Sequence, residues 1–150
     1  MGRRQKGCKG AAVAELAFFL PMALVLLLGA VDFGRAFYEL TAVANAATTG
    51  AKYGAHDAAH AGDINGMMSA ARDDLKNSVN ASEVDVAAER YCKCGTGAEI
   101  NCTTGTCAGG IGERRTYVRV RVGKPFATLF PYPGVPSSVN LSREAQMRVQ

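Results

Sequence analysis

The chain begins with a long apolar run, and a regular alternation of apolar and polar residues appears only later. From Ala11 to Val31 the sequence AAVAELAFFLPMALVLLLGAV carries a single charged side chain, Glu15. As an α-helix these 21 residues would be about 31 Å long, close to the roughly 30 Å hydrocarbon core of a bilayer. The pattern therefore predicts a membrane-spanning helix over residues 11–31, with a carboxylate near its start.

The helical pattern continues beyond the apolar run. Asp32, Arg35 and Glu39 are spaced by three and four residues, as in ion pairs on the surface of a helix. A secretory signal peptide would have a shorter apolar region, followed by a small-residue cleavage site and a change of pattern. We therefore expect one helix from about Ala11 to Ala59 that ends near Gly62, with residues 32–62 as an exposed arm.

The remaining pattern predicts a second short helix and several strands. Asn65–Asn77 is amphipathic with a helical period, whereas Glu83–Ala87 alternates polar and apolar residues. Tyr117–Val122 alternates more clearly, so that its three valines should point inward and its two arginines outward. Ser138–Val149 offers another strand. The loop Pro125–Pro136, with four of the five prolines, should connect the last two strands.

Four of the five cysteines lie in the stretch YCKCGTGAEINCTTGTC, at Cys92, Cys94, Cys102 and Cys107. An even set of cysteines in a Gly- and Thr-rich loop of a small exported domain predicts two disulfides. A zinc site is disfavoured because the spacing lacks the usual C-x2-C pairs. Three pairings are possible, and the nested one, Cys92 with Cys107 and Cys94 with Cys102, is the prediction we prefer.

Together these patterns predict an α+β protein in four parts. A basic leader, residues 1–10, precedes the transmembrane part of the helix, residues 11–31. The exposed helical arm, residues 32–62, leads to a head domain, residues 63–150. The head should hold a three- to four-stranded antiparallel sheet packed against the arm, with a disulfide-stapled loop at residues 92–107.

Charge indicates how such a chain would be oriented. The net charge is +4, and four positive side chains precede the apolar run: Arg3, Arg4, Lys6 and Lys9. Without them the chain is close to neutral, which speaks against a nucleic-acid-binding face. Because basic flanks stay on the cytoplasmic side of a membrane, the N-terminus should be cytoplasmic and the head outside. A lipoprotein is excluded because Cys8 precedes the apolar stretch, whereas a lipobox cysteine follows it.

The position of Glu15 is unusual for a membrane helix, where an ionised carboxylate costs a few kcal/mol and is usually retained for a function. A basic leader, then Gly10, then Ala11, with glutamate as the fifth residue after the glycine, resembles the processing site of a type IV prepilin. The resemblance implies cleavage between Gly10 and Ala11 by a prepilin peptidase. It also implies that Glu15 pairs with the new N-terminal ammonium of a neighbouring subunit. The alternative is a glutamate tolerated near headgroups and the positive end of the helix dipole.

The first third of the chain resembles the TadE-like family, the pseudopilins or minor pilins of the tight-adherence (Flp-type) pilus. The residues that carry this resemblance are Glu15, Pro21, Asp32-Phe33-Gly34-Arg35, Asn45-Ala46-Ala47 and Gly50-Ala51-Lys52-Tyr53. The resemblance implies a single-pass inner-membrane protein with a periplasmic or extracellular head. Its implied partners are a prepilin peptidase, other pilin or pseudopilin subunits, the inner-membrane assembly platform and membrane lipid, and it implies no nucleic acid.

One motif suggests an enzyme. In HDAAH, His56 and His60 are four residues apart with Asp57 beside the first, which is similar to the zincin pattern H-E-x-x-H. The glutamate base is missing, no histidine follows downstream, and Asp63 is a weak candidate for a third ligand. We expect both histidines to be solvated residues near the end of the arm, where a helix C-terminus favours their cationic form. The sequence thus predicts no enzyme, no cofactor and no metal.

Two other functions remain open. The head could be an adhesin-like binding module, carried by a helix that is never processed. The chain could also be a permanently anchored single-span protein, or an enzyme that uses His56 and His60. Only the assembly hypothesis uses Gly10, Glu15 and the continuing helix together.

Overall fold

A computed structural model describes residues 9–76, 83–95, 97–107, 114–132 and 134–150, apart from the side chains of residues 9–12. Residues 1–8 of the predicted leader, with Cys8, lie outside this range. The chain divides into two compact units, Met1–Arg35 and Ala36–Gln150. One helix, α1 (Lys9–Ala55), begins in the first unit and ends in the second, and it continues through Pro21.

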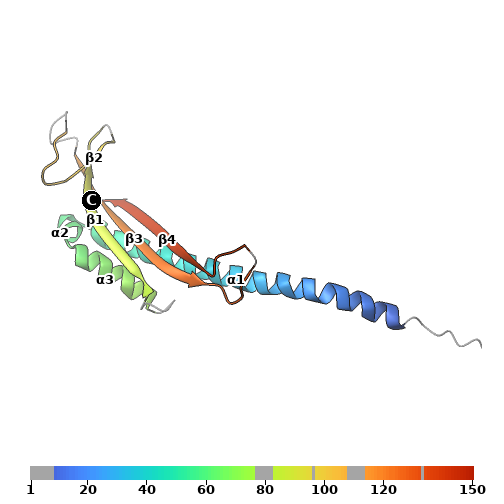
Figure 1. Ribbon diagram of the computed structural model, residues 1–150. Helices are drawn as coiled ribbons and strands as arrows, with labels where there is room; N and C mark the ends of the chain where they lie inside the picture. The colour runs from blue at the N-terminus through green and yellow to red at the C-terminus, as the bar shows by residue number, and fades with distance from the viewer. Residues whose placement is uncertain (1–8, 77–82, 96, 108–113, 133) are drawn as a thin grey trace, which may run out of the picture. The chain divides into compact units, whose positions relative to one another are not determined.

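The second unit contains two short helices and an antiparallel sheet (Figure 1). Its elements after α1 are α2 (Ala58–Gly62), α3 (Ile64–Leu75), β1 (Asp85–Lys93), β2 (Glu99–Ile100), β3 (Arg115–Ala127) and β4 (Ser138–Arg148). The strand order is β2-β1-β3-β4, and every neighbouring pair is antiparallel. The predicted α+β architecture, a long apolar helix followed by a four-stranded sheet, is confirmed.

The central strand β3 follows the alternation read from the sequence. Val118, Val120 and Val122 are fully buried, whereas Arg121 on the opposite face is exposed. β-Strand side chains point alternately to opposite faces, so one face of β3 contributes to the core and the other lies on the outer side of the sheet.

Two strands extend beyond their predicted limits. β1 reaches Lys93 instead of ending at Ala87, so it carries Cys92, the first of the four clustered cysteines. β3 includes Pro125, which was expected in the loop. Proline is tolerated there because the pairing with β1 stops at Asp85 opposite Gly123. Beyond that point β3 pairs with β4 only, and proline in a sheet is confined to such edges.

The prediction that one helix continues to Ala59 is wrong. α1 ends at Ala55, and Asp57 adopts an extended conformation with φ −158° and ψ 178°. The Asp57 carboxylate accepts a hydrogen bond of 2.8 Å from the backbone N–H of His60 and so caps α2. Asp63 caps α3 in the same way, through the N–H of Gly66 at 2.8 Å. Aspartate favours such caps over helix interiors because its short side chain satisfies free backbone donors.

The core lies between the helices and one face of the sheet, and α1 contributes only small residues to it besides Val43. The buried core residues are Ala42, Val43, Ala46, Ala47 and Ala51 of α1, Met67, Ala71 and Leu75 of α3, Ala61 of α2, Val86 of β1 and the three β3 valines. The α3 members recur every four residues, as expected for one face of a helix. Figure 1 shows α3 beside β1, with the end of α1 behind β3 and β4.

Two glycines of α1 let the elements approach closely. A Cβ atom at Gly50 would lie 2.8 Å from the carbonyl oxygen of Met67 and 3.1 Å from a methyl group of Val120. A Cβ atom at Gly54 would lie 2.2 Å from the sulfur of Met67. Glycine at a four-residue spacing removes the side chains that would otherwise separate two helices. The distance between α1 and both α3 and β3 therefore depends on these two positions.

One ion pair connects α1 with the sheet. Lys124 Nζ of β3 donates a 2.6 Å hydrogen bond to Glu39 Oε2, and the two side chains are 8% and 16% exposed. Burying either charge without the other would be costly, whereas a buried pair can be close to neutral overall. The pair therefore contributes little to the free energy of unfolding. Its main effect is to fix which part of α1 faces β3.

We predict that Gly50→Ala destabilises the second unit by about 1–2 kcal/mol. Overpacking costs about 1–3 kcal/mol, while the better helix propensity of alanine returns about 0.5–1 kcal/mol. Urea unfolding of the detergent-solubilised protein, followed by circular dichroism, measures the change. Gly34→Ala is the matched control, because a Cβ atom there meets nothing within 4 Å, and it should not destabilise. Equal stability of the two variants would contradict the close packing at Gly50.

We also predict strong coupling between Glu39 and Lys124. Glu39→Leu alone leaves a buried ammonium without its partner and should lower the free energy of unfolding by about 3 kcal/mol. The double variant Glu39→Leu/Lys124→Met should recover most of that loss, since an apolar pair of similar volume can replace a buried ion pair. Additive effects of the two substitutions in a double-mutant cycle would show that the two side chains do not interact.

Candidate functional site

The predicted processing residues lie at the start of α1. The helix begins at Lys9, so Gly10 and Ala11 belong to its first turn, and Glu15 is exposed. Four residues separate Ala11 from Glu15, which in an α-helix is an axial rise of about 6 Å. Glu15 therefore follows Ala11 by one turn. Cleavage after Gly10 and the pairing role of Glu15 stay predictions.

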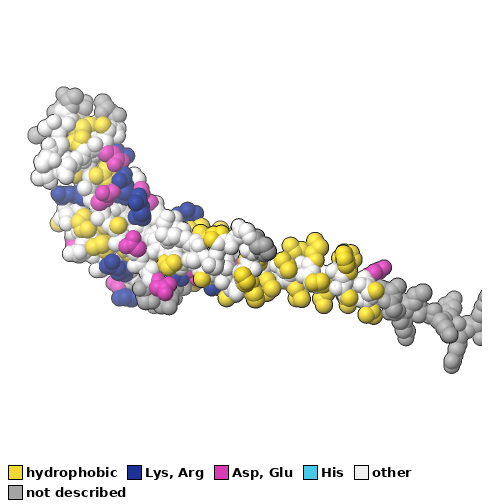
Figure 2. Space-filling view, in the orientation of Figure 1, with side chains coloured by type: hydrophobic (Ala, Val, Ile, Leu, Met, Phe, Trp, Pro, Cys, Tyr) yellow, Lys and Arg dark blue, Asp and Glu magenta, His cyan; other side chains and the backbone are white. Residues whose placement is uncertain are grey.

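The apolar side chains in the first part of α1 are exposed around the helix. Within the described part of the chain, one helix, Val13–Ala55, is long and apolar enough to cross a membrane, and only 6% of its most apolar window is buried. Figure 2 shows the apolar side chains along it. Exposed residues include Leu16, Phe18, Phe19, Leu20, Met22, Leu26 and Leu27, with Phe18 78% exposed. A helix that is apolar on all sides suits lipid or a bundle of apolar helices, so this part of α1 is a candidate membrane anchor.

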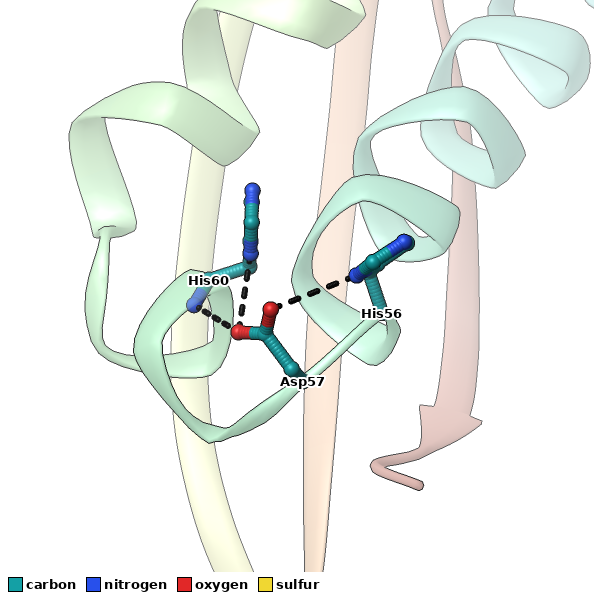
Figure 3. A group of neighbouring side chains, drawn as sticks. All are labelled: His56, Asp57 and His60. Carbon is teal, nitrogen blue, oxygen red and sulfur yellow. Dashed lines mark hydrogen bonds and ion pairs between the residues drawn. The ribbon is translucent and has the colours of Figure 1, made fainter.

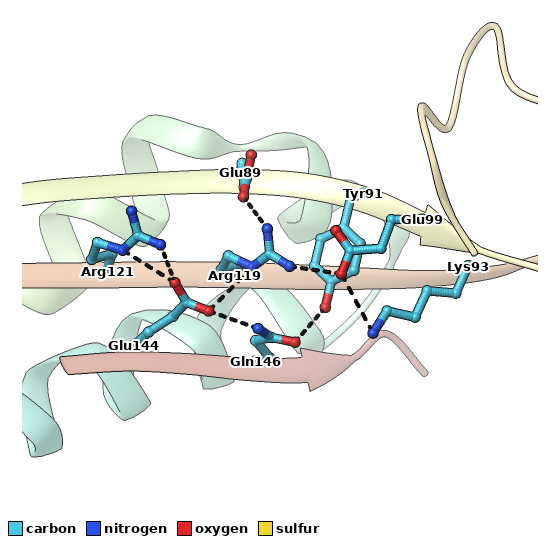
Figure 4. A network of polar contacts seen from close by, with 8 residues as sticks. All are labelled: Glu89, Tyr91, Lys93, Glu99, Arg119, Arg121, Glu144 and Gln146. Carbon is cyan, nitrogen blue, oxygen red and sulfur yellow. Dashed lines mark hydrogen bonds and ion pairs between the residues drawn. The ribbon is translucent and has the colours of Figure 1, made fainter. Parts of the chain in front are cut away.

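The outer face of the sheet carries a polar network centred on Arg119 (Figure 4). Its guanidinium donates to Glu89 at 2.7 Å and to Glu99 at 2.8 Å, and its Nε lies 3.3 Å from Glu144. It also lies over the ring of Tyr91, 4.4 Å from the centroid, a distance suited to a cation–π contact. Arg119 thus joins residues of β1, β2, β3 and β4.

The network extends along β4 and stabilises the charged forms of Glu144 and Arg119. Gln146 donates to Glu144 at 2.6 Å and accepts a 2.8 Å hydrogen bond from the hydroxyl of Tyr91. Arg121 also donates a hydrogen bond to Glu144. The hydrogen bond from Gln146 is the largest factor that lowers the pKa of the Glu144 carboxyl, followed by the hydrogen bond from Arg121. The hydrogen bond to Glu89 is the largest factor that raises the pKa of Arg119. A network of this kind specifies the register of the sheet, although in the described part of the chain Arg119 Nε itself is buried without an aligned hydrogen-bond partner.

The four head cysteines form two disulfides, as predicted, but with a different pairing. Cys92 bonds to Cys102 and Cys94 to Cys107, so the nested pairing is wrong. The reason is the hairpin between β1 and β2, in which Cys92 lies opposite Ile100. The turn is closed by the N–H of Gly97, which donates to the carbonyl of Cys94. Cys102 thus returns beside Cys92, and Cys94 at the turn bonds to the later Cys107.

His56, Asp57 and His60 come together where α1 ends and α2 begins (Figure 3). Asp57 Oδ2 lies 3.3 Å from His56 Nδ1, and Asp57 Oδ1 lies 2.8 Å from His60 Nδ1. The backbone N–H of His60 is the largest factor that lowers the pKa of Asp57, followed by the His60 side chain. His56 is solvated as expected, with 74% of its side chain exposed. His60 instead packs edge-on against the ring of Tyr53, 4.8 Å between centroids.

An open pocket of about 250 Å³ carries several arginines that the sequence analysis did not group. Its lining includes Arg90, Arg114, Arg115 and Arg148, together with Ala58 and Ala61 of α2. This volume of about 250 Å³ lies below the range of about 300–1,000 Å³ that is typical of ligand sites. Arginine side chains favour anionic groups. Arg114 and Arg115 are neighbours in the sequence, whereas Arg90 and Arg148 are distant from them, so no local spacing could have signalled the whole set.

Comparison with known proteins identifies one family. The sequence model of that family, described as TadE-like protein, matches residues 10–52, which is the segment from the predicted processing site almost to the end of α1. The resemblance read from the sequence is thereby confirmed over this part of the chain. No curated protein and no solved structure matches the chain.

We predict that mass spectrometry of an unreduced digest finds the linked peptides Cys92–Cys102 and Cys94–Cys107. Closing loops with sequence separations of 10 and 13 residues should stabilise the protein by about 3 kcal/mol each. Double serine variants of either bonded pair should therefore lose about that much in urea unfolding. Recovery of a Cys92–Cys107 peptide from the oxidised protein would contradict the observed pairing.

Proposed function

We propose, from the TadE-like segment at residues 10–52, that this protein is a pseudopilin or minor pilin of a tight-adherence (Flp-type) pilus. A prepilin peptidase cleaves it between Gly10 and Ala11, and the mature chain takes part in pilus assembly. Cleavage would leave 140 of the 150 residues. A subunit of this size is larger than the short main subunits of such pili, which favours a minor role.

The observation that carries this proposal is the exposed apolar surface of α1, with Glu15 one turn after Ala11. Cleavage would create an ammonium at Ala11, at the start of the helix. In a bundle of such helices, the carboxylate of one chain can pair with the ammonium of the next, which offsets part of the desolvation of both charges. The unpaired groups would lie near the membrane face before assembly, where burial is partial.

The proposal assigns the protein a structural role without catalysis. Its partners are the peptidase, other pilin or pseudopilin subunits, the assembly platform of the inner membrane and the lipid around α1. The helix anchors the chain with its N-terminus in the cytoplasm and its head on the periplasmic side. The network around Arg119, which forms ion pairs with three glutamates of the sheet, supports a rigid head.

The disulfide-stapled loop favours a second candidate, an adhesin-like binding module on an unprocessed anchor. Two disulfides within residues 92–107 fix a segment with little regular structure, as is common where a loop carries a binding surface. This candidate requires that the leader is retained and that Glu15 can be replaced without effect.

The first test is the intact mass and N-terminal sequence of the protein from membranes, with and without its prepilin peptidase. We expect the mature protein to start at Ala11 only when the peptidase is present. A start at Met1 or Gly2 in both samples would favour the unprocessed anchor. A start beyond Val31 would indicate a secretory signal and would remove any role for Glu15.

The same strains test the pairing role of Glu15. Glu15→Gln keeps the shape of the side chain but removes its charge, so it should leave processing intact and abolish assembly into pili. Glu83→Gln makes the same chemical change at an exposed position of the head and should assemble normally. Normal piliation by both variants would refute the pairing of Glu15 with a neighbouring ammonium.

A further inference from the structure

We propose that His56, Asp57 and His60 form a binding site for one divalent transition-metal ion, of which Zn²⁺ is the simplest probe. Each residue contributes one ligand atom, and the three atoms lie within 4.8 Å of one another. Two imidazoles and one carboxylate are ligands that suit zinc, copper or nickel. Three protein ligands leave a further coordination position for water or for a group of another molecule.

The distances in the cluster are close to those of a coordination sphere. Zinc binds imidazole nitrogen and carboxylate oxygen at about 2.0–2.2 Å, so two ligand atoms of a tetrahedral site lie about 3.3 Å apart. His56 Nδ1 and Asp57 Oδ2 are 3.3 Å apart, and His60 Nδ1 and Asp57 Oδ1 are 2.8 Å apart. Figure 3 shows both rings turned toward the carboxylate between them. The two short distances involve different oxygens of Asp57, and one ligand atom from each residue lies within 4.8 Å of the others, so side-chain rotations would bring the three ligands onto one ion.

The backbone holds the carboxylate in this position. Because Asp57 caps α2 through the N–H of His60, its side chain is fixed between the rings before any ion arrives. A carboxylate has about four lone-pair sites, so one backbone hydrogen bond leaves room for a metal. A continuous helix would not produce this arrangement, since adjacent residues point in different directions around a helix. The break after Ala55 brings Asp57 between the two histidines.

The state of His60 independently favours a ligand at this site. Its Nδ1 is buried from solvent, and among the described residues it has no aligned hydrogen-bond partner, despite its proximity to Asp57. A buried polar atom whose close contact is poorly aligned is less well satisfied than one in a full hydrogen bond, and coordination of an ion would satisfy it. Asp63 adds negative charge nearby, because its carboxylate accepts from the hydroxyl of Tyr53, whose ring contacts His60.

Coordination would join the end of α1 to the start of α2. His56 follows the last residue of α1, and His60 lies within α2, so one ion would bridge both sides of the helix break. Local unfolding of this junction would then require release of the ion. The site would thus stabilise the connection between the long helix and the head, whatever the chain assembles with.

The test uses the full chain in detergent, with its disulfides intact and a purification tag without histidine. Zn²⁺ is titrated at neutral pH by calorimetry and by ¹⁵N NMR of the imidazoles. The chain has only two histidines, so each ring nitrogen can be assigned. We expect one ion per chain, and a shift of Nδ1 in both rings. The absence of heat and of imidazole shifts at about millimolar Zn²⁺ would overturn the proposal.

Variants distinguish this site from adventitious binding to surface acids. Asp57→Asn preserves the helix cap, since asparagine caps helices as well as aspartate, but removes the carboxylate. It should lower the affinity by more than about tenfold, as should His60→Gln, because even outer-shell substitutions cost about 10–100-fold. Asp73→Asn on α3, outside the cluster, should bind as wild type. Equal affinity in all three variants would refute the site, and thermal unfolding without metal verifies their folding.

Discussion

The close approach of α1 to α3 and β3 is the constraint on which the second unit depends. At Gly50 and Gly54 there is no room for a Cβ atom beside Met67, and the other α1 residues at this interface are mostly alanines. Small side chains contribute little apolar area each, so the stability of the packing comes from contact between backbones and from the larger residues opposite. Those residues are the valines of β3 and the methionine and leucine of α3, all fully or almost fully buried.

The same helix meets two different environments, and its sequence changes accordingly. In the first unit large apolar side chains such as Phe18 and Leu26 are exposed around the helix. In the second unit one face is buried against α3 and the sheet. Glu39 marks this change, because its carboxylate binds Lys124 of β3. A helix that is apolar on all sides suits lipid or a bundle, whereas a one-sided helix suits a globular core. The TadE-like segment covers both parts, as expected if anchoring and support of the head are linked.

The break between α1 and α2 shows how a local change of backbone conformation can create a candidate metal site. Asp57 leaves the helical conformation and caps the next helix, and this places its carboxylate between His56 and His60. The packing of the core selects this break, since α2 and α3 turn back toward the sheet and bury Ala61 and Met67. The proposed metal site is therefore a consequence of the turn that closes the core, and its occupancy is independent of whether the chain forms pili.

The sequence by itself determined the features that depend on local periodicity. These are the apolar helix with Glu15, the alternation of Val118, Val120 and Val122 in β3, and the formation of two disulfides by the four clustered cysteines. Local pattern fixes the helix and the strand because their side chains repeat every 3.6 and 2 residues, and the even number of clustered cysteines in an exported domain indicates the two disulfides. Only the tertiary structure decided the contacts between distant positions. The disulfide pairing follows from the β1–β2 hairpin, and the network around Arg119 joins four strands. Glu39 meets Lys124 across 85 residues, and the cap at Asp57 depends on where the core turns the chain. No spacing in the sequence encodes such contacts, because they form only when the sheet and the helices pack together.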